Sequence, residues 1–130
     1  MRIITFGTFD LFHIGHLNIL NRAKAYGDSL VVGVSSDELN FRKKLFYPLF
    51  PYQDRANIVK ALSCVDEVFQ EDSLEKKKEY IIQYQADILV MGDDWHGKFD
   101  ELNSICKVIY LTRTADISST ALKERIRFTI

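Results

Sequence analysis

Cysteine is scarce in this sequence, and long apolar runs are missing from it. The two cysteines, Cys64 and Cys106, lie far apart among apolar residues and form no Cys-x-x-Cys pattern. We interpret them as reduced core residues, with a disulfide between them as the open alternative. No apolar run reaches the length of about 18 residues that a membrane helix needs, and the N-terminus has no signal-peptide pattern. We therefore expect a cytoplasmic protein without membrane segments.

An excess of charge of either sign is also missing. The 130 residues carry 17 basic and 18 acidic side chains, which gives a formal net charge of -1. This balance argues against non-specific binding to nucleic acid or to a membrane surface. The chain has no linkers, repeats or low-complexity tracts, so we expect a single domain over residues 1–130. Any anion that it binds must be held by local cations.

In place of these features the sequence has strand-like runs that alternate with helix-like stretches. The predicted strands are residues 2–6, 30–35, 65–69, 87–91 and 107–111, and the predicted helices are residues 15–26, 52–62, 74–84 and 118–127. Residues 36–40 indicate a turn or short helix, and residues 41–51 an exposed loop over the site. The alternation predicts an α/β fold, a Rossmann-like, doubly wound, parallel five-stranded sheet with helices on both faces.

The first predicted helix begins at an expected anion site. Gly7 ends the first strand, and His13 and His16 follow three residues apart, so a helix would place both imidazoles on one face. Unpaired N–H groups and the helix dipole favour phosphate at a helix N-terminus, and each imidazole can donate a hydrogen bond to it. An ordinary structural role and a metal site are the alternatives, although no further ligand completes a metal site locally.

A second phosphate site is predicted where the last helix begins. Arg113 can form two parallel hydrogen bonds to phosphate, while Ser118, Ser119 and Thr120 supply hydroxyls and backbone donors. The alternative is an ordinary serine N-cap beside a surface arginine. Ligands of doubly wound sheets bind beyond the carboxyl ends of the strands. Three polar loops leave those ends, at residues 7–16, 92–97 and 112–119. The topology therefore predicts that these loops converge on one pocket.

Taken together, these motifs resemble the cytidylyltransferases of the nucleotidyltransferase superfamily. The resemblance rests on His-x-Gly-His, Ile-Ser-Ser-Thr and four further stretches, at residues 13–16, 117–120, 7–10, 65–68, 91–95 and 113–114. It implies transfer of CMP from CTP to a small alcohol phosphate, with glycerol 3-phosphate as the first choice, and release of pyrophosphate. It also implies a homodimer, and Mg²⁺ that bridges the phosphates of CTP.

The resemblance implies roles for single residues as well. His13 and His16 would stabilise the triphosphate as the α-phosphorus becomes five-coordinate, and Lys43, Lys44 and Arg113 complete the expected catalytic set. The expected nucleotide-binding residues are Gly7, Thr8, Phe9, His13, His16, Gly92, Asp93, Asp94, Arg113, Thr114, Ser118, Ser119 and Thr120. The expected acceptor-binding residues are Asp10, Lys43, Lys44, Arg55, Asp94 and Trp95. From the pattern of its helix, Arg55 is expected on the exposed side.

The chain departs from the family pattern in two places. Ser63 and Cys64 stand before the Val-Asp-Glu-Val stretch, where the family often has an arginine and an aromatic residue. Lys43 and Lys44 are adjacent, in place of a Lys-x-Lys arrangement. Both departures concern the acceptor side, so another acceptor phosphate is an alternative to glycerol 3-phosphate. An adenylyltransferase of the same superfamily and a nucleotide-binding module without turnover are further alternatives.

Overall fold

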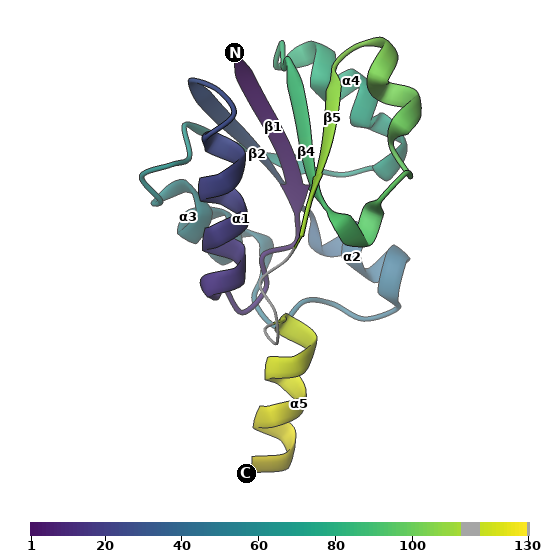
Figure 1. Cartoon of the computed structure of the whole chain (residues 1–130). Coiled ribbons are helices and arrows are strands. Elements are labelled where there is room, and N and C mark those ends of the chain that lie inside the picture. The colour runs from purple at the N-terminus through teal and green to yellow at the C-terminus, as the bar shows by residue number, and fades with distance from the viewer. Residues whose placement is uncertain (113–117, 130) are drawn as a thin grey trace.

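The computed structural model of the chain describes residues 1–112 and 118–129 (Figure 1). The strands are β1 (Arg2–Gly7), β2 (Ser29–Ser35), β3 (Glu67–Glu71), β4 (Ile88–Gly92) and β5 (Lys107–Leu111). The α-helices are α1 (Ile14–Lys24), α2 (Asp37–Lys44), α3 (Tyr52–Lys60), α4 (Lys77–Gln83) and α5 (Ser119–Thr129). Three short 3-10 helices are η1 (Leu74–Lys76), η2 (Asp93–Trp95) and η3 (Asp100–Ser104).

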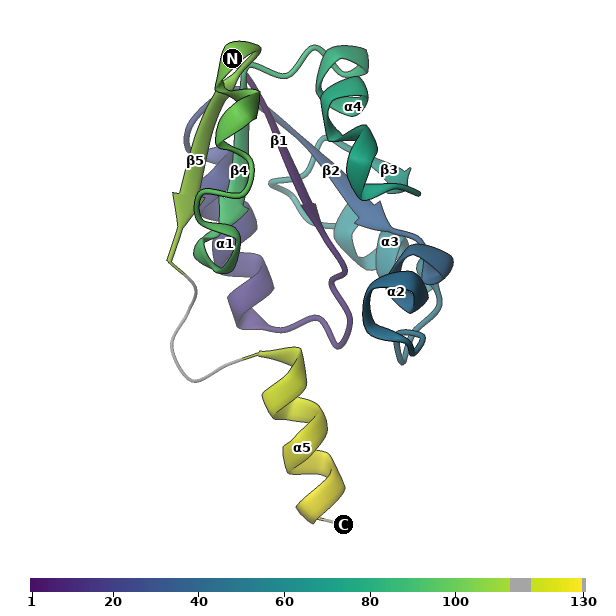
Figure 2. The same cartoon turned by 90° about the vertical axis from the view of Figure 1, so that its right-hand side faces the viewer.

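Within the described residues the strands form one sheet in the order β3-β2-β1-β4-β5, and every strand pair is parallel. The chain runs outward from β1 to β3 and then crosses back to β4, so the strand order reverses between β1 and β4. Helices α1 and α3 cover one face, while α4 covers the other (Figures 1 and 2). The predicted doubly wound α/β sheet is confirmed, and the switch point is the place where such folds bind ligands.

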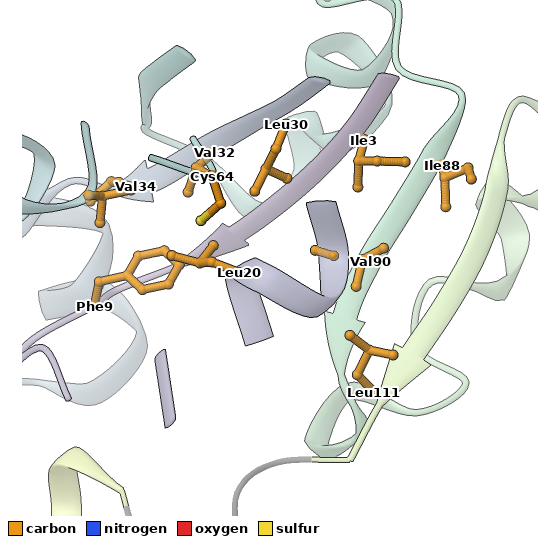
Figure 3. Packing of buried hydrophobic residues seen from close by; sticks show 12 residues of the cluster. Ile3, Phe9, Leu20, Leu30, Val32, Val34, Cys64, Ile88, Val90 and Leu111 are labelled. Atoms are coloured by element: carbon orange, nitrogen blue, oxygen red, sulfur yellow. The ribbon is translucent and has the colours of Figure 1, made fainter. Parts of the chain in front are cut away.

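Two apolar clusters, one on each face, hold the helices to the sheet. Successive residues of β1 point to opposite faces, so Ile3 packs with Leu20 of α1 whereas Ile4 packs with Ile81 of α4. Figure 3 shows the first cluster, in which Cys64 also lies. Cys106 belongs to the second cluster, and both cysteines are free and buried. The interpretation of these cysteines as reduced core residues is confirmed, and the disulfide alternative is wrong.

The segment before the predicted loop differs most from expectation. Residues 37–44 form α2, so Lys43 and Lys44 lie in the last helical turn and not in a loop. The Ser36 side chain caps this helix by accepting from Leu39 N at 3.0 Å, and acidic residues in the first turn and basic residues in the last turn oppose the helix dipole. The predicted helix over residues 74–84 is divided into η1 and α4. The other predicted elements agree with the structure to within two residues at each end.

Helix α5 lies beyond the carboxyl ends of the strands and extends away from the sheet (Figures 1 and 2). Neither apolar cluster of buried residues includes a described residue of this helix. The described part of this helix is therefore not packed into the core on either face of the sheet. None of the helices that the structure describes is both long enough and apolar enough to cross a membrane.

We expect Gly33→Ala to lower the free energy of unfolding by about 1–3 kcal/mol, the usual effect of overpacking a core. A Cβ atom at Gly33 of β2 would lie 2.6 Å from Phe6 Cδ1 and 2.7 Å from Phe69 Cζ. Gly92→Ala is the matched control, because a Cβ there meets only Ile19 Cδ1, at 3.7 Å. Urea unfolding of both variants checks this, and equal stabilities would contradict it.

Candidate active site

A pocket of about 510 Å³ lies at the carboxyl ends of β1 and β4, where the strand order reverses. Its walls come from all three predicted loops and from α2, α5 and the segment after α2. The lining residues are Thr5, Phe6, Gly7, Thr8, Phe9, Asp10, His16, Ile19, Asn40, Lys44, Phe46, Pro48, Gly92, Asp94, Trp95, Ser119, Thr120, Lys123, Glu124 and Arg127. The predicted convergence is confirmed for the parts of these loops that the structure describes.

Several expected site residues are not among the described lining residues of the pocket. Arg113 and Thr114 fall outside the described residues, so the structure says nothing of them. The pocket wall, as far as it is described, does not include His13, Lys43, Arg55, Asp93 or Ser118. Three of these five, His13, Arg55 and Ser118, have structural hydrogen bonds of their own.

The two histidines form the N-terminal cap of α1, and their rings lie side by side as expected. His13 is the N-cap residue, with the extended backbone angles φ -141° and ψ 179°, so only its expected place within the helix is wrong. The Nδ1 atom of His13 accepts from Gly15 N at 3.0 Å, and the Nδ1 atom of His16 accepts from His13 N at 3.2 Å. The rings stack with centroids 3.9 Å apart. Because each Nδ1 is an acceptor, the proton of each neutral ring is on Nε2.

Burial keeps this pair uncharged. Removal from water is the main cause that lowers the pKa of His16 to about 4, and the neighbouring His13 lowers it further. Burial also lowers the pKa of His13. At neutral pH the rings are thus hydrogen-bond donors without a full charge. A metal site is not supported, because both Nδ1 atoms are engaged and the described residues contain no group of three or more possible ligands.

A polar network behind the first loop orients Thr8. The Thr8 hydroxyl donates to Asn40 Oδ1 at 2.8 Å, and Asn40 Nδ2 donates to Ser35 Oγ at 2.8 Å and to Ser36 O at 2.9 Å. Asn40 is 1% exposed and lines the pocket, but the sequence pattern did not single it out. The one feature that could have indicated its role is a polar amide side chain at a buried position of a helix. The loop also holds Phe9 at a φ of 55°, a left-handed conformation that costs energy.

Arg55 lies inside the fold, so its predicted place on the exposed side of α3 is wrong. Its side chain is 1% exposed, and four of its five N–H donors are used. Nε donates to Phe50 O at 2.9 Å, Nη1 to Thr8 O and Ser35 O at 2.8 Å each, and Nη2 to Asp37 Oδ1 at 2.7 Å. The guanidinium therefore joins the first loop, β2, α2 and the segment before α3. Only one N–H donor of Arg55 is left for the contact with the acceptor that the resemblance implies.

Asp10 is likewise committed to the protein itself. The carboxylate accepts from Leu49 N at 2.8 Å and from Phe50 N at 3.1 Å, and it forms an ion pair with Lys123 at 2.8 Å. Burial alone would raise the pKa of Asp10, but Lys123 and the two backbone donors outweigh this and leave that pKa below its usual value. Asp10 thus ties the segment after α2 and helix α5 to the first loop. Its expected role toward the acceptor stays a prediction.

The structure separates the two adjacent lysines. Lys44 lines the pocket, whereas Lys43 is not among the described lining residues, and burial lowers the pKa of Lys43. Behind the pocket wall, Lys77 pairs with Glu71 at 2.6 Å and lies 4.4 Å from the ring centroid of Phe6. Both partners of this pair are buried, and the pattern of a charged amphipathic helix gave no sign of it.

Helix α5 begins at the pocket. Ser118 Oγ accepts from Ala121 N at 3.0 Å, so the ordinary N-cap anticipated as an alternative is present at this residue. The Ser119 hydroxyl donates to the carbonyl oxygen of Asp10, and Thr120 lines the pocket beside it. Two helix N-termini, those of α1 and α5, therefore face the same space. This arrangement suits a ligand with several phosphate groups.

Comparison with known proteins agrees with this geometry. The Cytidylyltransferase-like family matches residues 4–125, which is most of the chain. The chain belongs to the cytidylyltransferase-like family. This cytidylyltransferase-like chain is 49% identical over 127 residues to the glycerol-3-phosphate cytidylyltransferase of Bacillus subtilis (strain 168), with 96% of each chain covered. It is 41% identical over 127 residues to the glycerol-3-phosphate cytidylyltransferase of Staphylococcus aureus (strain NCTC 8325 / PS 47), covering 96% of this chain and 94% of that one.

The fold of this cytidylyltransferase-like chain is shared with solved structures. The lipopolysaccharide core biosynthesis protein from Thermoplasma volcanium GSS1 superposes with a TM-score of 0.74 at 25% identity. The superposition covers 88% of this chain and 98% of that one. The doubly wound sheet is therefore a framework that the family and this structural neighbour share.

In this cytidylyltransferase-like protein we expect Arg55→Leu to lower the free energy of unfolding by about 3–5 kcal/mol, the usual cost of breaking a buried ion pair. The leucine leaves Asp37 and three carbonyl oxygens without their donor. Lys60→Leu, an exposed cation on the same helix, is the matched control and should change stability little. Urea unfolding compares the two variants, and similar losses would contradict the structural role of Arg55.

We also expect His16 to make the protein less stable in acid. Its folded-state pKa of about 4 lies below the ordinary 6.5, so between these values the unfolded chain binds more protons and stability rises with pH. Acidification from pH 6.5 to 4 should therefore cost up to about 3 kcal/mol through this residue. His16→Gln removes that share of the loss. Urea unfolding across this pH range measures the difference, and a His16 ring resonance that titrates near pH 6.5 would contradict it.

Proposed function

We propose that this chain is a glycerol-3-phosphate cytidylyltransferase, which forms CDP-glycerol and pyrophosphate from CTP and glycerol 3-phosphate. The observation that carries the proposal is 49% identity to an enzyme of that name over 96% of both chains. The pocket at the switch point supports it, because two helix N-termini and His16 meet there. These donors fit a nucleoside triphosphate as the class of ligand.

The reaction needs positioning more than it needs a nucleophilic side chain. A phosphate oxygen of the acceptor attacks the α-phosphorus of CTP, a P–O bond forms, and the bond to the β-phosphate oxygen breaks so that pyrophosphate leaves. The attacking oxygen is already ionised at neutral pH, so no general base is required. Negative charge builds on the equatorial and leaving oxygens as the transition state forms. Catalysis therefore requires donors that are already in place around those oxygens.

The pocket residues supply such donors. His16 presents an Nε2–H that is held in place by the Nδ1 bond to the backbone of His13, so its ring need not reorient during the reaction. Thr120 offers a second hydroxyl from the far wall, whereas the Thr8 hydroxyl already donates its proton to Asn40 Oδ1 and helps to fix the first loop. Asp94 and Trp95 line the pocket beside them, in keeping with their expected place near the nucleoside and the acceptor.

The charge of the pocket explains why a metal ion is expected. The described lining has equal numbers of basic and acidic side chains, namely Lys44, Lys123, Arg127, Asp10, Asp94 and Glu124. These charges nearly cancel, whereas a triphosphate carries about four negative charges that positioning groups must neutralise. Mg²⁺ is usually held by substrate phosphates with one or two carboxylates, and Asp94 fits that requirement. When bound, Mg²⁺ would neutralise charge on the phosphates. The homodimer stays a prediction from the family resemblance.

We expect purified protein to release pyrophosphate from CTP and glycerol 3-phosphate in the presence of Mg²⁺. His16→Ala should lower kcat by about 10²- to 10³-fold, the usual cost of one lost donor to a developing oxyanion. His96→Ala is the matched control, because His96 is exposed and lies outside the described pocket wall.

Substrate panels separate the proposal from its alternatives. ATP in place of CTP tests for an adenylyltransferase, and other alcohol phosphates test the acceptor. No pyrophosphate above the His16→Ala level with any acceptor would contradict the proposal. CTP binding without turnover would indicate a binding module instead.

A further inference from the structure

Helix α5 forms one wall of the pocket although it stands apart from the sheet (Figure 2). Thr120, Lys123, Glu124 and Arg127 line the pocket, and their spacing of three and four residues places them on one face of the helix. Because α5 has no described residue in either buried cluster, its apolar contacts with the sheet are few. Contacts outside the two apolar clusters must therefore hold this wall in place.

Two contacts of α5 with the body of the protein meet at Asp10. The Ser119 hydroxyl donates to the backbone oxygen of Asp10, and Lys123 Nζ lies 2.8 Å from its carboxylate. The carboxylate is 5% exposed and the lysine side chain 30%, so water screens this ion pair only in part. Lys123 Nζ also lies 5.9 Å from the ring centroid of Phe46, another residue of the pocket wall. One buried carboxylate thus joins α5 to the first loop.

We propose that Lys123 is a positioning residue for the nucleotide. Its ion pair with Asp10 holds the first turn of α5, with Ser119 and Thr120, against the first loop so that the two helix N-termini face each other. The proposal rests on the proposed function, because it gives the second wall of the CTP pocket its anchor. Without the pair, α5 can still form a helix, but the ion pair with Asp10 no longer holds it against the first loop. The pocket then binds the triphosphate less well, while the chemistry at His16 is unchanged once CTP is bound.

The first test compares three variants of one helix. We expect Lys123→Met to raise the KM for CTP about tenfold, the effect of losing a partly buried charge pair, with kcat within about twofold of the original protein. Lys123→Arg keeps the positive charge and should recover most of this loss. Arg125→Met is the matched control, since Arg125 is exposed on the same helix and is not part of the described pocket wall. An unchanged KM in Lys123→Met would overturn the proposal.

A double-mutant cycle distinguishes tethering from direct contact. If Lys123 acts through Asp10, then Lys123→Met should change the KM for CTP by less than about twofold in an Asp10→Asn background. If the ammonium binds the nucleotide itself, the loss from Lys123→Met persists in that background. The second result would overturn the proposal.

Hydrogen exchange without nucleotide tests the tether even if the proposed function fails. The amides in the first turns of α5 should exchange at least about threefold faster in Lys123→Met than in Arg125→Met, because the tethered helix opens less often. Equal exchange in the two variants would overturn the proposal. Absence of turnover in the unmodified protein would contradict the proposed function alone, since the exchange comparison needs no CTP.

Discussion

The need of the backbone N–H groups at the start of α1 for hydrogen-bond partners is the constraint on which the pocket depends. A helix that begins at the switch point of a parallel sheet presents free donors to whatever binds there. In this chain His13 and His16 satisfy two backbone donors with their Nδ1 atoms. The same bonds fix both rings and place the protons on Nε2. One local capping arrangement therefore starts the helix and prepares donors for phosphate.

Around this start, buried polar side chains hold the loops that the pocket needs. Arg55 lies behind the wall and Asp10 forms part of it, and between them they engage the backbone of Thr8, Leu49 and Phe50. Burial of such charges is favourable only when nearly every donor and acceptor is paired, as it is here. The loops cannot shift independently, because moving one would leave a charge unpaired in the interior. Rigidity at the pocket thus follows from the cost of exposing unpaired groups.

The sequence predicts the sheet well because its signals are local. Runs such as residues 30–35 are apolar without alternation, which is typical of strands buried on both faces. Local sequence patterns could not predict that Arg55 is buried, because its partners Thr8 and Ser35 are 47 and 20 residues away in the sequence. The same reason hides the role of Lys123, whose partner is Asp10. Chemistry and topology predicted part of the pocket lining, such as His16, Asp94 and Thr120, whereas Asn40 and the side chains that position the loops depend on tertiary contacts.

Neutral histidines change how the pocket must handle charge. His16, with its pKa lowered to about 4, offers direction and hydrogen bonding but little net charge at neutral pH. The positive side chains of the described wall lie on the helices around this centre, Lys44 on α2 and Lys123 and Arg127 on α5, and three acidic side chains of the same wall balance them. The rigid centre can therefore orient the reacting phosphates by hydrogen bonding, while the described wall adds no excess of positive charge. The pocket can thus orient a highly charged ligand without a highly charged core.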